Sequence, residues 1–177
     1  MIIGIFSDAH GDYQAIEKAL GAMQPASRLF YLGDVHEFDP GVKNCIDLLR
    51  ARGVTAVKGN CDRHAVIGDM DGSYRAWLAA LPREHRDGDL VFVHEPKDPE
   101  YAFDRESFHI CFCGHTHRSF LISAEGSQKL LPGMGVTLDR EARYIVGIGS
   151  VSRPRAAEAK VAALYDTQSG SLNLLQL

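Results

Sequence analysis

The first sixty residues of the chain repeat one order three times: a short apolar stretch, a tight polar turn and then a helical pattern. The apolar stretches are residues 2–6, 28–32 and 54–57, and apolar side chains recur at helical spacing over 16–23 and 42–49. Strands that alternate with helices in this way predict βαβ units with parallel strands. In sheets of this kind, ligand-binding residues gather just beyond the carboxyl ends of the strands.

The second half of the chain is richer in strands. One more amphipathic helix is expected over 74–81. Apolar stretches follow at 90–93 and 109–113, and short strands broken by glycine or proline then close in a hairpin around 169–170. Helices early and strands late predict an α/β fold of two sheets packed face to face with helices outside. For a chain of this length we expect a single domain, 1–177.

Composition narrows the class of protein. Apolar residues make up 45% of the chain and charged residues 24%, and the formal net charge is −4. We therefore expect no bulk nucleic-acid binding and no membrane association. The apolar run 1–6 is too short for the core of a signal peptide or for a membrane span. Four cysteines without a CxxC pair favour a reducing compartment, so a cytoplasmic protein is expected.

Side chains that can bind a metal follow five of the expected strands. They are carboxylates, one amide and imidazoles: Asp8, His10, Asp34, Asn60, His94, His115 and His117. Any single one of them is usually a helix cap, a turn residue or an ordinary histidine. Seven of them at strand ends, with two pairs spaced two residues apart, are much harder to explain structurally. They exceed the needs of one tetrahedral site but suit two ions that share a carboxylate.

The ligand chemistry indicates the kind of metal. Mixed oxygen and imidazole ligands without a thiolate pair favour manganese, iron, zinc, nickel or cobalt over a closed structural zinc. We take manganese as the first choice among these divalent transition metals. Two ions roughly 3.5 to 4 Å apart are the usual device for activating water and neutralising charge on a phosphate. The residues alone therefore predict a dinuclear hydrolase.

The chain also resembles a known family. The motifs "SDAHG", "LGD", "KGNCD", a histidine after the fourth strand and "CGHTH" are spread over residues 5–117, with a weaker similarity in "GSVSRPR" at 149–155. Together they resemble the calcineurin-like metallophosphoesterases, especially the small prokaryotic phosphodiesterase branch. The resemblance implies a four-layer α/β/β/α sandwich of two mixed sheets, with both ions at one edge. It implies these ligands: Asp8, His10 and His117 for the first ion, Asn60, His94 and His115 for the second, and Asp34 as the bridge.

The expected protein is a metal-dependent phosphoesterase, and a phosphodiesterase is the first choice within this class. A dinuclear metal centre would activate water for in-line attack on the phosphorus of a small phosphoester or nucleotide. A phosphomonoesterase or a dinucleoside polyphosphatase stays open as an alternative, and so does a homo-oligomer. A non-catalytic scaffold is the rival class, as in the retromer subunit that resembles this fold. Lost ligands would favour a scaffold, and all seven are present.

The stretch "KGNCDRH" at 58–64 raises the question of the general acid. Beside the predicted ligands Asp34 and Asn60, Cys61 stands where the family often has a histidine that protonates the leaving group. Nearby metal ions would lower the pKa of this thiol, and a thiolate cannot donate a proton. His64 could supply the proton instead, or Cys61 could simply be packed. We expect Asp62 to orient a ligand from behind.

Residues around the ligands invite further hypotheses. Glu95 follows His94 where the family commonly has glycine, which would place a negative group beside the second ion. In the loop 95–104, Tyr101 and Phe103 could stack on a base or gate the site, and a plain surface connection is equally consistent with the pattern.

The remaining candidates have simpler expectations. His36 is expected to be a solvated loop residue. Buried free thiols are expected at Cys45, Cys111 and Cys113. Arginines that could clamp a phosphate are Arg63, Arg118, Arg153 and Arg155.

Overall fold

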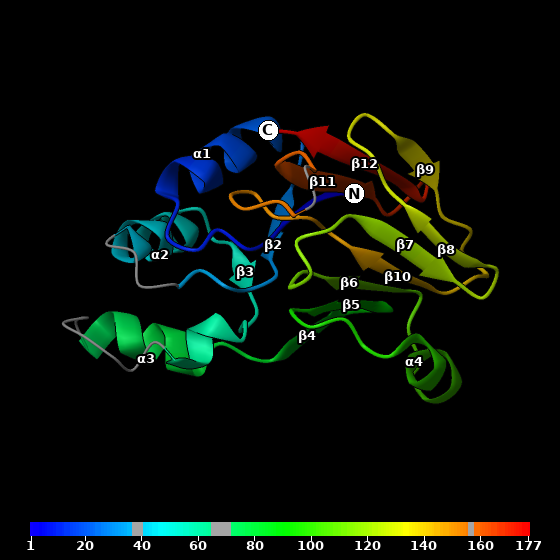
Figure 1. The fold of residues 1–177 in the computed structure, drawn as a ribbon, viewed down its shortest axis with the longest axis horizontal. Coiled ribbons are helices and arrows are strands. Elements are labelled where there is room, and N and C mark those ends of the chain that lie inside the picture. Colours follow the sequence, from blue (N-terminus) through cyan, green and yellow to red (C-terminus); the bar gives the residue numbers. More distant parts are fainter. Residues whose placement is uncertain (37–40, 65–71, 156–157) are drawn as a thin grey trace.

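Two six-stranded mixed sheets, packed face to face, form the centre of the fold (Figure 1). The computed structural model describes residues 1–36, 41–64, 72–155 and 158–177. The first sheet has the strand order β3 (Thr55–Ala56), β2 (Arg28–Tyr31), β1 (Ile2–Phe6), β11 (Val161–Asp166), β12 (Ser171–Gln176) and β9 (Gly135–Thr137). The second has the order β4 (Glu84–Asp87), β5 (Leu90–Val93), β6 (Ile110–Cys113), β10 (Tyr144–Gly147), β7 (Phe120–Ser123) and β8 (Gly126–Lys129).

Each sheet combines parallel and antiparallel strands. In the first sheet β1, β2 and β3 run parallel, whereas β11 is antiparallel to β1. In the second sheet β5, β6 and β10 run parallel, with antiparallel neighbours β4 and β7. Each sheet therefore brings the carboxyl ends of several parallel strands to one edge, where ligand-binding residues collect.

Helices cover the outer faces of the sandwich (Figure 1). α1 (Tyr13–Ala22), α2 (Val42–Ala51) and α3 (Gly72–Ala80) share an apolar cluster with the outer face of the first sheet. α4 (Pro99–Arg105) packs on the outer face of the second sheet. A short 3-10 helix, η1 (Cys61–His64), follows β3. The predicted α/β sandwich of two mixed sheets with helices outside is confirmed.

Local sequence explains α1 and α2, two of the three helices that pack on the first sheet. The Asp12 side chain caps α1 by accepting a hydrogen bond of 2.9 Å from the main-chain N–H of Ala15. The buried side chains of α2 are spaced one helical turn apart, so one face of the helix is apolar. These side chains are Val42, Cys45, Ile46 and Leu49.

The main core lies between the two sheets. Ile3 and Ile5 of β1 point into it, whereas Phe6 points to the helices, as the alternation of a strand requires. The ring of Phe92 stacks on Phe30 of the opposite sheet at a centroid distance of 3.9 Å. This contact fixes the second sheet against the first close to the strand ends that carry the predicted ligands.

Helix α4 lies where the sequence analysis expected a loop. The side chain of Asp98 accepts a hydrogen bond of 3.0 Å from the main-chain N–H of Tyr101, and Pro99 occupies the first turn. Asp as N-cap followed by Pro is a recognised start signal for a helix, because Pro needs no hydrogen bond there. The hypothesis of an open loop over 95–104 is therefore wrong for residues 99–104.

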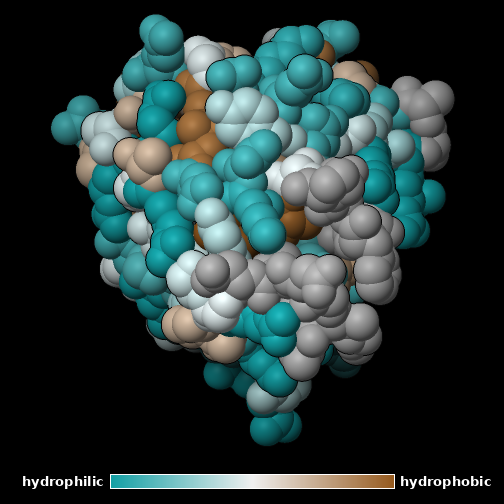
Figure 2. Space-filling view, turned by 90° about the vertical axis from the view of Figure 1, so that its left-hand side faces the viewer, coloured by the Kyte–Doolittle hydropathy of each residue, from teal (hydrophilic) through white to brown (hydrophobic). Residues whose placement is uncertain are grey.

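The face that carries α1, α2 and α3 is mainly hydrophilic, with hydrophobic residues visible only in small areas (Figure 2). The apolar sides of these helices are turned towards the sheet instead. Among the described residues, no helix is both long and apolar enough to cross a membrane.

Candidate metal centre

The seven predicted ligands follow the carboxyl ends of parallel strands in both sheets. Asp8 and His10 follow β1, Asp34 follows β2 and Asn60 follows β3. From the second sheet, His94 follows β5, and His115 and His117 follow β6. Contacts between the two sets join the sheets at this edge, for example from His117 Nε2 to Asp8 Oδ1 at 3.3 Å.

An unusual backbone conformation recurs at these positions. Within the described ranges, the non-glycine residues with positive φ are all predicted ligands: Asp8, His10, Asp34, His115 and His117. Their φ values lie between 48° and 66°. This left-handed region is uncommon for residues with a side chain and costs about 1–3 kcal/mol each. Such strain persists where the surrounding structure imposes it, typically at functional sites.

Asp8, His10 and His117 form one cluster of donor atoms, all within 4.8 Å of one another. The Nε2 atoms of His10 and His117 face each other at 3.1 Å. His117 Nδ1 lies 2.5 Å from the carbonyl oxygen of Arg153, which can only accept, so Nδ1 donates and Nε2 points its lone pair inwards. Asp8 is fully buried, and its Oδ1 has no hydrogen-bond partner within the part of the chain described. A cation between these atoms would satisfy all of them.

Asn60, His94 and His115 form a second cluster. Asn60 Oδ1 lies 2.9 Å from His94 Nε2 and 2.7 Å from His115 Nδ1. His94 Nδ1 donates to the carbonyl oxygen of Leu32 at 2.8 Å, because that oxygen can only accept. The lone pair of His94 Nε2 therefore meets oxygen atoms with lone pairs of their own. This donor set also fits a cation.

Asp34 lies between the two clusters. Its Oδ2 is 3.2 Å from His94 Nε2, and its Oδ1 accepts a hydrogen bond of 2.8 Å from the main-chain N–H of Cys61. Donor atoms of Asp8, Asp34 and His94 also lie within 4.8 Å of one another. The structure thus brings all seven predicted ligands together, with Asp34 between the two clusters.

Two glycines allow this close approach. A Cβ on Gly59 would lie 1.9 Å from Asp34 Oδ1, and a Cβ on Gly114 would lie 2.0 Å from Ser7 Oγ and 2.8 Å from Asp8 Oδ2. Any other residue at either position would displace a carboxylate of the centre.

Asp62 supports the centre from behind, as the sequence analysis predicted. It accepts hydrogen bonds of 2.8 to 3.0 Å from four main-chain N–H groups. The donors are Asp34, Val35, His36 and Gly59. These bonds hold Asp34 in its left-handed conformation and join the turn after β2 to the turn after β3.

A further support was missed in the sequence. The hydroxyl groups of Ser150 and Ser152 both donate to the main-chain oxygen of Asp8, each at 2.8 Å. With the Arg153 carbonyl that accepts from His117, these residues fix the first cluster from the segment after β10. The similarity noted at 149–155 was the available signal, but position in the sequence does not show that this segment returns to the end of β1.

The same contacts determine how the pKa values of the ligand side chains are shifted. Burial opposes the charged form of Asp34, but hydrogen bonds from His94 and Cys61 outweigh it and lower the pKa of this carboxyl. Burial likewise opposes a charged His94, but the carboxylates of Asp34 and Asp8 outweigh it and raise its pKa. The Asp8 carboxylate, 3.3 Å from His117 Nε2, raises the pKa of His117. Burial lowers the pKa of His10.

Cys61 and His64 are the two candidates for the general acid. Burial, followed by the charge of Asp34, raises the pKa of Cys61 to about 12, so the protein groups alone keep a neutral thiol. The expected thiolate depends on metal ions bound next to Cys61, so it stays a prediction. His64 ends η1, and its side chain lies outside the described residues.

Three expectations about the surroundings are corrected. His36 is buried rather than solvated. Glu95 is exposed and lies 3.6 Å from Arg63, so its charge is paired with a guanidinium at the surface. Phe103 packs with Phe108 on the outer face of the second sheet, and Tyr101 is 57% exposed on α4. Neither aromatic ring is placed to gate the ligands.

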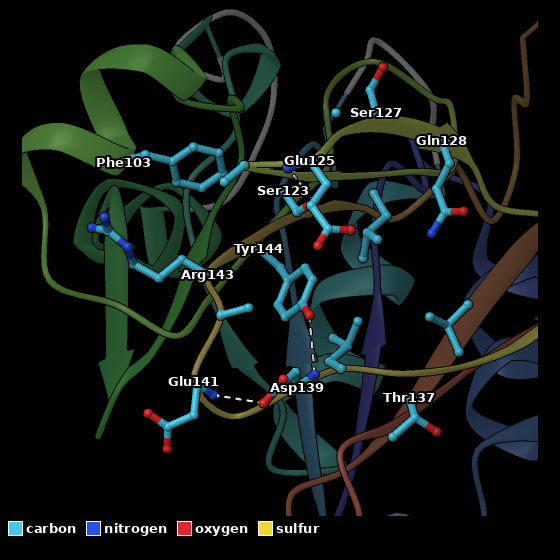
Figure 3. Close-up of a pocket in the computed structure, with 16 residues that line it drawn as sticks. Phe103, Ser123, Glu125, Ser127, Gln128, Thr137, Asp139, Glu141, Arg143 and Tyr144 are labelled. Atoms are coloured by element: carbon cyan, nitrogen blue, oxygen red, sulfur yellow. Dashed lines mark hydrogen bonds between the residues drawn. The ribbon is translucent and has the colours of Figure 1, made fainter.

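Two hollows differ in their relation to the centre. A cavity of about 390 Å³ opens beside His10, and Tyr13, Gln14, Ser152 and Arg153 line it. A larger hollow of about 710 Å³ is lined by residues of β7, β8 and β9 and by Tyr144 at the start of β10 (Figure 3). None of the seven predicted ligands, all of them described, lines this second hollow.

Comparisons with known proteins agree with this geometry. The chain matches the calcineurin-like phosphoesterase superfamily domain over residues 1–170. The uncharacterized protein MJ0912 of Methanocaldococcus jannaschii is 26% identical over 213 residues, covering 99% of this chain and 87% of that protein.

Solved structures share the fold. A metallophosphoesterase from Sphaerobacter thermophilus is 22% identical, with a TM-score of 0.89 over 100% of this chain and 88% of that one. An archaeal phosphodiesterase is 16% identical, with a TM-score of 0.66 over 100% of both chains. The family uses divalent metals, and the donor clusters fit them. Since the family match covers nearly the whole chain, this protein is a hydrolytic enzyme that belongs to the calcineurin-like phosphoesterase superfamily.

Proposed function

We propose that this enzyme is a phosphodiesterase with two divalent transition-metal ions, built as a single domain over 1–177. Asp34 would bridge the ions. The other ligands would be Asp8, His10 and His117 for the first ion, and Asn60, His94 and His115 for the second. The observation that carries the proposal is the buried Oδ1 of Asp8, which has no hydrogen-bond partner in the described ranges although imidazole nitrogens surround it.

In this chemistry the protein residues orient the atoms that bind the metal ions. Bound ions of this kind activate water and neutralise charge that develops on the phosphoryl oxygens. His94 and His117 donate their Nδ1 protons to main-chain oxygens, which keeps both Nε2 atoms directed inwards. Asn60 contributes a neutral oxygen, which limits the negative charge that the anionic substrate meets.

The cavity beside His10 supports a small phosphoester as substrate. Arg153 lines the cavity, and its positive charge contributes to the lowered pKa of His10. A guanidinium next to the ligands suits the non-bridging oxygens of a phosphodiester, which carries one negative charge. Ser152 and Gln14 add polar groups to the same wall.

The test compares substrates and metal states. Chelator-treated enzyme is expected to be inactive and to regain activity with Mn²⁺, with two ions per chain by elemental analysis. Hydrolysis of bis(p-nitrophenyl) phosphate should exceed that of p-nitrophenyl phosphate and of diadenosine tetraphosphate. In Asp34→Asn, kcat/KM should fall more than about 100-fold. Substitution of residues that only hydrogen-bond a metal ligand already lowers metal affinity or activity about 10–100-fold.

Asp104→Asn, which alters an exposed carboxylate on α4, is the matched control and should retain full activity. Full activity without metal, or in Asp34→Asn, would refute the proposal. Faster hydrolysis of the monoester or of the dinucleotide would identify one of the alternative activities.

A further inference from the structure

Cys61 lies in a cluster with two of the proposed ligands, although neither proposed ligand set includes Cys61 itself. Its Sγ, a ring nitrogen of His10 and a carboxylate oxygen of Asp34 all lie within 4.8 Å of one another. The other three cysteines, Cys45, Cys111 and Cys113, are buried. Cys61 is thus the one thiol of the chain that is both partly exposed and next to the metal-binding edge.

The position of Cys61 is fixed by its neighbours. Its main-chain N–H donates to Asp34 Oδ1 at 2.8 Å, and its Sγ lies 3.5 Å from Asn60 Nδ2. It is also the first residue of η1, so its backbone is held by a regular turn. The sulfur therefore stays beside the carboxylate that lies between the two ligand clusters.

A second observation concerns the adjoining cluster of Asp8, His10 and His117, which shares His10 with the Cys61 cluster. Asp8 Oδ1, fully buried and without a hydrogen-bond partner among the described residues, lies 3.9 Å from His10 Nε2. Metal–nitrogen and metal–sulfur bonds of about 2.0–2.3 Å place tetrahedral donor atoms roughly 3.3–3.8 Å apart. A spacing within 4.8 Å is close enough for a small side-chain rotation to complete such a site.

We propose that Cys61 is a further, thiolate ligand of the first ion, the one assigned above to Asp8, His10 and His117 with Asp34 as the bridge. The inference rests on the proposed metal centre. When the ion binds, the S–H bond breaks, a sulfur–metal bond forms and the proton leaves to the solvent. Cys61 then carries no proton for a leaving group, so substrates whose leaving groups depart readily as anions are favoured.

Sulfur also changes which metal the first position prefers. Thiolate is a soft ligand that favours zinc and other borderline ions over manganese. The second position, with amide and imidazole ligands, lacks a thiolate and should prefer zinc over manganese less strongly. The two positions therefore differ in metal affinity, and zinc or cobalt is expected to fill the first one before manganese does.

Cobalt provides a direct spectroscopic test in the full-length chain. Titration of Co²⁺ into the chelator-treated protein should give visible d–d bands and a near-ultraviolet band of thiolate-to-cobalt charge transfer. Cys61→Ser should lose the near-ultraviolet band and keep the visible ones. Its affinity for Zn²⁺, measured by competition with a chromophoric chelator, should fall at least tenfold, with a smaller loss for Mn²⁺.

Cys45→Ala, which removes a thiol on the inner face of α2, is the control and should keep both features. Visible bands without a near-ultraviolet band in the wild type would overturn thiolate ligation and leave the metal centre intact. A near-ultraviolet band that persists in Cys61→Ser, or disappears in Cys45→Ala, would also overturn it. Failure to bind Co²⁺ at all would instead refute the metal centre on which the inference rests.

Discussion

Asp62 connects the two turns that carry Asp34 and Asn60. Its two carboxylate oxygens accept four main-chain hydrogen bonds, although the side chain itself touches none of the proposed ions. Each N–H group that it satisfies would otherwise be buried without a partner, at a cost of about 1–3 kcal/mol. The conformation of Asp34 therefore depends on a residue that is not a ligand.

Asp62→Asn tests this role at the scale of one residue. The amide keeps the shape of the side chain but turns one acceptor into a donor that faces N–H groups. We expect metal affinity to fall roughly 10–100-fold and the unfolding free energy to fall by about 2 kcal/mol. Isothermal titration and urea denaturation measure these two quantities. Unchanged metal affinity in a folded variant would show that the four hydrogen bonds do not position Asp34.

Helix α4 is the element whose role changes most between sequence and structure. It covers the outer face of the second sheet through Ala102 and Phe103, and its exposed side carries Tyr101. The Asp98 cap and the ring contacts of Phe103 are structural interactions. The helix therefore stabilises the sheet, and we expect it to lie outside the substrate site.

Asp98→Ala removes the cap of α4. Loss of an N-cap costs about 0.5–2 kcal/mol, so the unfolding free energy should fall by that amount. Because α4 is expected to lie outside the substrate site, KM for nucleotide diesters should stay unchanged in this variant and in Tyr101→Ala. A rise in KM specific to nucleotide diesters would restore the hypothesis of an aromatic gate.

At the scale of the whole molecule, the centre joins the two sheets. Asp8, His10, Asp34 and Asn60 belong to the first sheet, whereas His94, His115 and His117 belong to the second. Ions shared by these residues would connect the two halves of the sandwich next to the Phe30–Phe92 contact. Metal binding should therefore stabilise the entire fold.

Thermal unfolding in the presence of metal checks this expectation. A ligand that binds only the folded state stabilises it by about 2.7 kcal/mol at a concentration of 100 Kd. The melting temperature should rise with Mn²⁺ or Zn²⁺ concentration in the wild type and rise much less in Asp34→Asn. An equal rise in both proteins would mean that the stabilising ion binds elsewhere.

Local patterns were sufficient for the architecture and for the residues of the candidate centre. The alternation of strands and helices predicted parallel pairing, and parallel pairing places Asp8, Asp34 and Asn60 at one edge for purely geometric reasons. The sequence also showed that His94 and His115 each follow a strand, and the structure assigns those strands to the second sheet. Helix α4 could also have been predicted, since Asp98 followed by Pro99 is a start signal for a helix. The acidic and aromatic composition of the segment favoured a loop instead.

Other features depended on contacts between residues distant in sequence. Ser150 and Ser152 reach Asp8 across more than 140 positions, and His36 is buried because Asp62 draws its backbone inwards. The pKa of Cys61 depends on burial and on neighbouring carboxylates that only the folded chain supplies. The sequence by itself determined which ligands exist and which strand each follows, because strand period and turn chemistry are local. Only the tertiary structure decided how their donor atoms face one another, because that depends on how the two sheets pack.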